Sequence, residues 1–292
     1  MMQARIVAAL GAPPEAADEV APLVLITTTG DRIQDRRLLE AGGKSLFVKE
    51  IEEALLDGRI DCAVHSMKDV PAELPRGLVI AAVPEREDAR DALVSVGDRP
   101  FEDLPQGARL GTASLRRQAQ SLFRRPDLKI EMLRGNVDTR LRKLDEGEFD
   151  AILLAAAGLN RLGLSQRISD RLDVEVAPPA PGQGALAIET RADDAGADWL
   201  AGLHHAETEI ATAAERGALE ALEGSCRTAI GAHARLSDGT LSLIVEALTP
   251  DGSRRFRRLG AEGAPTAEAA AAFGRRLGEE MRAEGGPGLV FG

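Results

Sequence analysis

Cysteine and aromatic residues are scarce in this chain of 292 residues. Its two cysteines, Cys62 and Cys226, lie far apart and outside any CxxC motif or Cys/His cluster, which argues against a disulfide framework and against a metal site. There is no tyrosine, and aromatic residues make up 3% of the chain. Because single-strand nucleic-acid binders stack bases on aromatic side chains, this scarcity and the net charge of −11 argue against nucleic acid as a partner.

Long apolar runs are also missing. No run approaches the ~20 residues that cross a bilayer, and the start of the chain lacks the basic segment and cleavage site of a secretory signal. With 44% hydrophobic and 28% charged residues, the composition indicates a water-soluble, globular protein of two or three domains. We therefore expect it in the cytoplasm, without a membrane partner.

Positive charge, although outnumbered overall, is concentrated in one segment. Residues 109–143 carry ten arginines and lysines against three acidic residues. A basic segment in an acidic protein suggests a site for a specific anionic ligand. The alternative is a solvated helix face that is rich in arginine.

The spacing of apolar residues predicts an α/β fold. We expect strands at 22–29, 60–66, 77–83, 109–112, 128–133, 150–158 and 184–190, and helices at 44–58, 114–125, 137–147 and 197–222. This alternation is typical of α/β domains with a largely parallel sheet. Proline and glycine are frequent at 176–190, which predicts a hinge between two lobes that would enclose an anion.

The last part of the chain has a different pattern. Strands are expected at 229–236 and within 241–260, joined through an Asp251-Gly252 turn, and a helix follows at 266–285. This pattern predicts a small α+β domain. The expected domains are lobe one at 1–85 with 184–202, lobe two at 89–178, and the C-terminal domain at 206–292.

Three motifs supply candidate site residues. "VHSMKDVP" places Lys68 and Asp69 after a strand, where a carboxylate could hold a cation or move a proton and the lysine could bind a carboxylate; the alternative is a surface turn. "GTASLRRQ" and "RGNVDTRL" each join a strand end to a helix start. Four arginines on one cleft would hold a polycarboxylate, and their dispersal over the surface is the alternative. The residues of these two motifs are Thr112, Ser114, Arg116, Arg117, Arg134 and Arg140.

Cys226 lies in "EGSCRT", between a helix-like and a strand-like run. A hydrolase cysteine would need a histidine base, and His65 or His233 are candidates, although neither belongs to a nucleophile signature. A loop with Gly224 and Ser225 could instead expose the sulfur for covalent attachment. Cys62, within an apolar strand, is most simply a buried structural thiol.

Seven ordered segments from Thr27 to Gly231 resemble the porphobilinogen deaminase family, also called hydroxymethylbilane synthases. They are "GGKSLFVKEIEEALL", "AVHSMKDVP", "GTASLRRQ", "RGNVDTRL", "LAAAGLNRLGL", "PAPGQGALAIE" and "LEGSCRTAIGA". The resemblance implies two lobes like those of periplasmic binding proteins and a small α+β C-terminal domain. It also implies a cytoplasmic, monomeric transferase of tetrapyrrole and haem biosynthesis, which deaminates four porphobilinogen molecules, joins them head to tail on a tethered primer and releases hydroxymethylbilane.

The resemblance also assigns roles to residues. Cys226 is implied to hold a dipyrromethane cofactor through a thioether, and Asp69 to stabilise the cationic intermediate and assist proton transfer. Cofactor contacts are implied for Lys68, Asp69, Thr112, Ser114, Arg116, Arg117 and Arg134. Substrate contacts are implied for Arg134, Arg140, Arg161, Gln183, Lys44 and Phe47. No metal or nucleotide is implied.

One departure from the family pattern concerns the start of the chain. The family begins with a strand and a loop whose arginine and serine contact the cofactor and substrate, and no such segment precedes residues 2–20. We expect lobe one to lack this strand and the chain to be less soluble or less active than an N-terminally extended one. A two-lobed anion-binding module without catalysis, or a form inactivated by truncation, is the alternative function.

Overall fold

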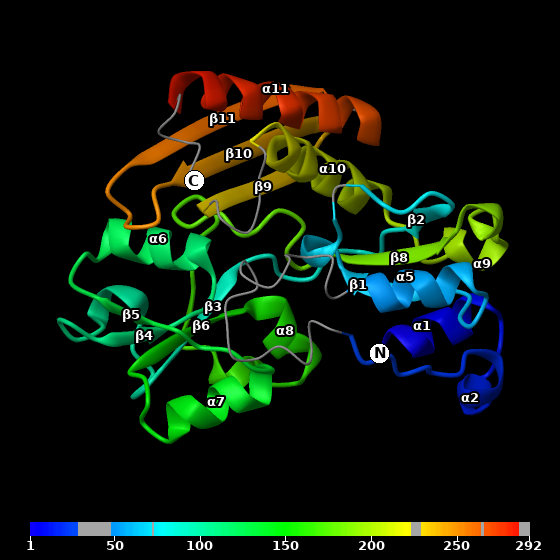
Figure 1. Cartoon of the computed structure of the whole chain (residues 1–292), viewed down its shortest axis with the longest axis horizontal. Helices are drawn as coiled ribbons and strands as arrows, with labels where there is room; N and C mark the ends of the chain where they lie inside the picture. The colour runs from blue at the N-terminus through cyan, green and yellow to red at the C-terminus, as the bar shows by residue number, and fades with distance from the viewer. Residues whose placement is uncertain (29–47, 72, 223–228, 264–265, 286–292) are drawn as a thin grey trace. The chain divides into compact units, whose positions relative to one another are not determined.

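The computed structural model describes residues 1–28, 48–71, 73–222, 229–263 and 266–285 (Figure 1). The predictions for Lys44, Phe47 and Cys226 lie outside these described residues. The chain divides into two compact units. Unit 1 comprises Met1–Arg86 and Ala185–Glu209, and unit 2 comprises Glu87–Gly184 and Ile210–Gly292. The three-domain boundaries expected from the sequence stay a prediction.

Unit 1 contains a small sheet with the strand order β1-β8-β2. Its strands are β1 (Ala63–Ser66), β2 (Leu78–Ala82) and β8 (Leu186–Arg191). Among the described residues of this unit, the α-helices are α1 (Met2–Ala9), α2 (Ala17–Val20), α5 (Lys49–Leu56) and α9 (Asp198–Ala201), and a 3-10 turn, η3, lies at Met67–Asp69. Leu55 of α5 packs on Ala63 and Leu78, which buries the apolar face of this amphipathic helix against the sheet.

The strand predicted at 22–29 is wrong over its described part, because residues 22–28 form no strand. Leu23, Val24 and Leu25 are 70%, 55% and 94% exposed. None of the described strands of unit 1 pairs with this segment. A β-branched, apolar composition favours a strand only where a neighbouring strand supplies hydrogen bonds and a packing surface.

Unit 2 contains a five-stranded sheet with the order β5-β4-β6-β3-β7. Its strands are β3 (Asp91–Ser95), β4 (Arg109–Gly111), β5 (Lys129–Glu131), β6 (Ala151–Ala155) and β7 (Asp170–Arg171). The helices α6 (Leu115–Arg124), α7 (Val137–Asp145) and α8 (Ala156–Arg161) accompany it. Separate apolar clusters line its two faces, which explains why the central strand β6 reads as the continuous apolar run AILLA.

The expectation of a largely parallel sheet is wrong. In unit 1, β8 pairs antiparallel with both β1 and β2. In unit 2, β4 pairs parallel with β5 and β6, whereas β3 pairs antiparallel with β6 and β7. The strand–helix crossovers from β4 to β6 give the parallel pairs as predicted. The strands β3 and β8 begin just after the chain passes from one unit to the other, so no crossover helix sets their direction.

The C-terminal part of unit 2 confirms the predicted α+β pattern. Strands β9 (Ala229–Ser237), β10 (Thr240–Leu248) and β11 (Arg255–Gly263) form an antiparallel sheet in the order β11-β10-β9. Helix α11 (Ala267–Gly285) lies over this sheet in Figure 1, and α10 (Ala206–Ala221) contributes to the same core. A β-carbon on Gly274 would lie 1.9 Å from the Ala214 carbonyl oxygen, so this glycine permits the close approach of α11 to α10.

No helix in the described ranges has both the length and the apolar character needed to cross a membrane.

Candidate functional site

The N-terminus of α6 is built by the GTASLRRQ motif. Ser114 is the N-cap of the helix, and its Oγ accepts a hydrogen bond from the backbone N–H of Arg117 at 3.4 Å. The Thr112 Oγ1 accepts the Ser114 N–H at 3.1 Å, and Thr112 is buried. Both predicted hydroxyl residues therefore shape the turn that leads from β4 into α6. This turn therefore fixes the positions of Arg116 and Arg117 in the first turn of α6.

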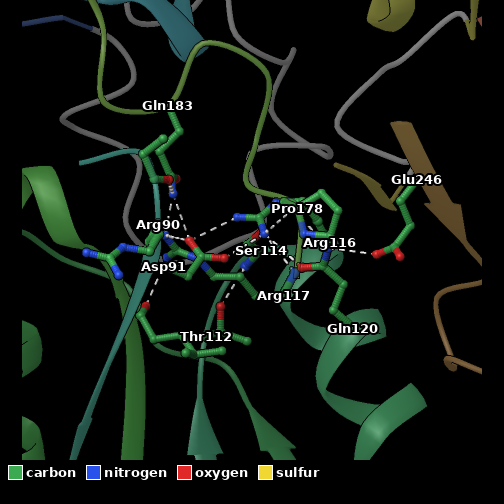
Figure 2. A network of polar contacts seen from close by, with 12 residues as sticks. Arg90, Asp91, Thr112, Ser114, Arg116, Arg117, Gln120, Pro178, Gln183 and Glu246 are labelled. Carbon is green, nitrogen blue, oxygen red and sulfur yellow. Dashed lines mark hydrogen bonds and ion pairs between the residues drawn. The ribbon is translucent and has the colours of Figure 1, made fainter. Parts of the chain in front are cut away.

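Those arginines, Arg116 and Arg117, lie in a buried polar network around Asp91, the first residue of β3 (Figure 2). Arg116 donates from Nη1 and Nη2 to the two Asp91 carboxylate oxygens at 2.6 and 3.1 Å. Arg117 donates from Nε and Nη2 to Asp91 Oδ1 at 3.0 and 2.8 Å. The side chains of the two arginines are 5% and 8% exposed, and that of Asp91 is 1% exposed, so the three charges are removed from solvent together.

Burial alone would raise the pKa of Asp91. The charges of Arg116 and Arg117, with hydrogen bonds to the carboxylate, outweigh burial and hold the pKa of Asp91 well below its usual range. Gln183 supplies one of these bonds, since its Nε2 donates to Asp91 Oδ1 at 2.9 Å and to the Ala89 carbonyl at 2.8 Å. Gln183 thus lies inside the network, and its expected contact with substrate stays a prediction.

A second group of cations comes from the RGNVDTRL motif. Asn136 caps α7 by accepting the Thr139 N–H at 2.8 Å, and Arg140 on the first turns of α7 donates from Nε to the Gly135 carbonyl at 2.7 Å. Gly135 has a φ of +117°, which favours glycine at this position. The motif therefore turns back on itself and brings Arg134 and Arg140 to one end of α7.

Arg140 is close enough to Arg117 and to Arg134 for its charge to be repelled by both. Burial lowers the pKa of Arg140 to about 10, and the charges of Arg117 and Arg134 add to this effect. Among the described residues, the buried Nη1 of Arg134 has no hydrogen-bond partner. A buried guanidinium nitrogen without an acceptor, on a side chain beside the like charge of Arg140, is the arrangement that an anionic ligand would stabilise.

Arg161, at the end of α8, donates from Nη2 to the Gly184 carbonyl at 2.7 Å. Burial lowers the pKa of Arg161, and the charge of Glu87 opposes this effect. Arg161 therefore supports the segment in which Gly184 sits. Its expected role with substrate stays a prediction.

In unit 1, Lys68 and Asp69 belong to η3, which follows β1 directly. Both side chains are partly exposed, whereas Met67 and Val70 on either side are buried. The two buried neighbours anchor the turn, so that Lys68 and Asp69 are held at the surface of the unit. This is the position at a strand end that the sequence predicts.

The candidate histidine bases have other partners. His65 Nε2 lies 2.8 Å from Glu189 Oε2, and both side chains are buried. His233 Nδ1 lies 3.6 Å from the buried carboxylate of Glu215. Cys62 comes just before β1 and is only partly buried, so the expectation of a buried thiol within the strand is wrong. Burial, followed by the charge of Asp61, raises the pKa of its thiol, as expected of an unreactive cysteine.

Three site residues escaped prediction from sequence: Asp91, Gln120 and Glu246. Asp91 opens the strand DALVS, and a lone carboxylate at the start of an otherwise apolar, buried strand is the signal that could have found it. Gln120 and Glu246 carry no such local signal, because they bond to each other across 126 residues of the chain. Within the described ranges, no group of three or more His, Cys, Asp or Glu side chains could hold a metal ion.

Fold and site together define an α/β protein with a buried, arginine-rich polar network. Two family models match the chain: "Porphobilinogen deaminase, dipyromethane cofactor binding domain" over residues 1–198, and the porphobilinogen deaminase C-terminal domain over residues 210–283. The chain belongs to the porphobilinogen deaminase family.

Curated relatives agree with this assignment. The porphobilinogen deaminase of Caulobacter vibrioides is 66% identical, over 100% of this chain and 92% of its own length. That of Phenylobacterium zucineum is 63% identical over 100% and 93%, and that of Syntrophotalea carbinolica is 53% identical over 90% and 83%. Among solved structures, an ancestral arginine-binding protein bound to arginine matches with a TM-score of 0.36 and 16% identity, over 69% of this chain and 78% of its own. That likeness is too weak to add to the family assignment.

Proposed function

We propose that this chain is a hydroxymethylbilane-forming transferase. It removes ammonia from four porphobilinogen molecules, joins them head to tail through carbon–carbon bonds and releases the linear tetrapyrrole. Family membership supports the reaction class. The cluster of Arg117, Arg134 and Arg140 supports a substrate with carboxylate groups. Among the described residues, the buried Nη1 of Arg134 has no hydrogen-bond partner and could bind such a group. Porphobilinogen and its oligomers carry carboxylate side chains that complement this cluster.

The same cluster fits the family's dipyrromethane cofactor, which also carries carboxylates. We assign Cys226 as its thioether attachment point, and assign the contacts with its acidic side chains to Lys68, Arg116, Arg117 and Arg134. Thr112 and Ser114 support these contacts by fixing the start of α6. The bound cofactor supplies the pyrrole carbon to which the first substrate is joined.

Asp69 is the proposed catalytic residue. Loss of ammonia from porphobilinogen leaves positive charge on the pyrrole, and a carboxylate stabilises that charge and accepts the proton that is later released. Arg140, Arg161 and Gln183 are assigned to substrate and to the growing chain, together with Lys44 and Phe47. Guanidinium groups suit this role because each binds a carboxylate through two parallel hydrogen bonds.

The protein is further proposed to act as a cytoplasmic monomer, without nucleic acid or membrane as partner. The low aromatic content and the net charge of −11 argue against nucleic acid as a partner.

Product formation from porphobilinogen by an Asp69→Asn variant tests the assignment. We expect the variant to lose activity by at least about a hundredfold, as is usual for a general acid or base, while its mass still includes the cofactor. Asp61→Asn is the matched control, because Asp61 precedes the same strand and its side chain is 94% exposed. Retained turnover in Asp69→Asn would remove Asp69 from its role.

A further inference from the structure

The guanidinium group of Arg116 is held from two sides. Asp91 binds it on one side, as described above. On the other side, Arg116 Nη1 donates to Gln120 Oε1 at 2.8 Å and to the Pro178 carbonyl at 3.1 Å. Gln120 lies one turn further along α6 and is 5% exposed. Its amide oxygen therefore limits the rotation of Arg116 about the ion pair with Asp91.

Gln120 is itself fixed by groups outside α6. Its Nε2 donates to the Pro178 carbonyl at 2.9 Å and to Glu246 Oε1 on β10 at 2.9 Å. The amide oxygen of Gln120 therefore accepts from Arg116, and the amide nitrogen donates to Pro178 and Glu246. If the amide were flipped, its N–H groups would point at the Arg116 cation. Hydrogen bonds inside a buried network are costly to leave unmade, so this orientation is strongly preferred.

Glu246 anchors the far end of this chain of contacts. It is 1% exposed and accepts hydrogen bonds from Arg257 Nε and Nη2 of β11 at 2.9 and 2.5 Å. Arg257 also donates to the Glu175 carbonyl at 2.6 Å. A continuous series of polar contacts therefore runs from β3 of the five-stranded sheet to β11 of the three-stranded sheet; its residues are Asp91, Arg116, Gln120, Glu246 and Arg257, of which Figure 2 shows the part up to Glu246.

The backbone of α6 is docked on the same three-stranded sheet. Ala119 packs with Ala229 of β9 and Leu248 of β10 in a small apolar cluster. A β-carbon on Gly252 would lie 2.6 Å from the Phe123 backbone nitrogen, so the β10–β11 turn sits directly against the helix. Gln118 Nε2 donates to the Pro250 carbonyl at 3.1 Å in the same turn. The position of α6 therefore depends on these contacts, whereas the orientation of the Arg116 side chain depends on Gln120.

We infer that Gln120 and Glu246 are positioning residues that set the orientation of Arg116 from the C-terminal sheet. The consequence for catalysis rests on the proposed function, in which Arg116 binds carboxylates of the cofactor. The orientation itself does not depend on that function, because it follows from the contacts within unit 2.

The first test measures orientation without activity. In ¹H–¹⁵N spectra of arginine side chains, the guanidinium of Arg116, identified by its loss in Arg116→Lys, should show restricted rotation with separate Nη signals. Gln120→Leu removes one of the acceptors for Arg116 and the donor to Glu246, so the guanidinium should rotate faster and these signals should merge. Gln118→Leu, on the same helix but without contact to Arg116, should leave them separate. Separate Nη signals for Arg116 in Gln120→Leu would overturn the inference.

The second test asks whether the orientation matters for turnover. Gln120→Leu should lower kcat/KM for porphobilinogen by about tenfold, the effect of losing one hydrogen bond to a buried charge, while Gln118→Leu should leave it unchanged. In an Arg116→Lys background the further loss from Gln120→Leu should vanish, because Gln120 acts through Arg116. Equal losses in both backgrounds would show that Gln120 acts on stability alone. If the wild-type chain forms no product and carries no cofactor, the proposed function fails. The side-chain spectra would still show whether Gln120 sets the orientation of Arg116.

Discussion

The Asp91 carboxylate receives two hydrogen bonds from the guanidinium of Arg116, at 2.6 and 3.1 Å, in a setting where both side chains are almost fully buried. Because Arg117 binds the same carboxylate, one negative charge faces two positive charges and neutralises only one of them. The remaining positive charge lies near Arg134 and Arg140, which interact electrostatically with Arg117 or with each other. The excess of positive charge among these arginines therefore favours the binding of an additional anion.

Asp91→Asn tests how far the fold depends on this carboxylate. The amide keeps the shape of the side chain and leaves two buried cations without a counter-charge, which should destabilise the chain by about 3–5 kcal/mol. Urea unfolding at neutral pH measures the loss. Asp98→Asn is the control, because Asp98 is exposed and asparagine tolerates its positive φ of 53°. An Asp91→Asn variant as stable as the wild type would contradict the described network.

The same carboxylate predicts a dependence of stability on pH. Since the folded-state pKa of Asp91 lies below the unfolded value of about 3.9, its contribution is present above that value and is lost as pH falls through the folded-state pKa. The difference in stability between wild type and Asp91→Asn should therefore be constant near neutral pH and shrink in acid. A difference that grows on acidification would contradict this sign.

Glu52 in unit 1 shows the opposite shift. Burial raises its pKa, the charge of Glu189 raises it further, and His65 opposes the rise. Stability is then greatest below the unfolded value of about 4.3 and is lost as pH rises through the folded-state pKa. Glu52→Gln should raise the Tm at pH 7 by roughly 2 °C, equivalent to about 1 kcal/mol in a chain of this length, and change it little at pH 4.

Glu53→Gln provides the control for this comparison. Glu53 follows Glu52 on α5, but its side chain is 56% exposed and pairs with Lys49, which is 73% exposed, at 3.9 Å. Exposed ion pairs contribute little, so the Tm should stay nearly constant at both pH values. A lower Tm for Glu52→Gln at pH 7 would mean that the Glu52 carboxylate is stabilising.

Arg140→Gln should separate stability from function. Removal of a guanidinium whose pKa is lowered by burial and by two like charges should leave the Tm unchanged or raise it. Loss of a ligand for substrate carboxylates should lower kcat/KM for porphobilinogen by about tenfold or more. Arg142→Gln, on the exposed side of the same helix and paired with Glu146, should change neither quantity. A large fall in Tm for Arg140→Gln would indicate a structural role instead.

Local signals in the sequence predicted much of unit 2. Ser114 and Asn136 cap α6 and α7 where their motifs place the helix starts, because capping involves residues within one turn. The Asp251-Gly252 turn and its flanking strands were likewise predicted, since alternation and turn chemistry are local.

Non-local pairing was not predictable in the same way. Asp91 and Arg116 are 25 residues apart, and Gln120 and Glu246 are 126 apart, so no helical or strand spacing relates them. The antiparallel direction of β3 and β8 depends on how the chain passes between the units, and the segment at 22–28 has the composition of a strand without a described partner. Burial of Arg116 and Arg117 with an internal carboxylate also could not be inferred from a motif that equally suits an exposed anion site.

The proposed function requires that this chain carries the cofactor of its family and uses it. The intact mass of the purified chain under denaturing conditions, compared with that of Cys226→Ser, tests this most directly. We expect a wild-type mass that exceeds the polypeptide mass by two linked pyrrole units, and a Cys226→Ser mass without this excess. An unmodified wild-type mass, or an excess that persists in the variant, would contradict it.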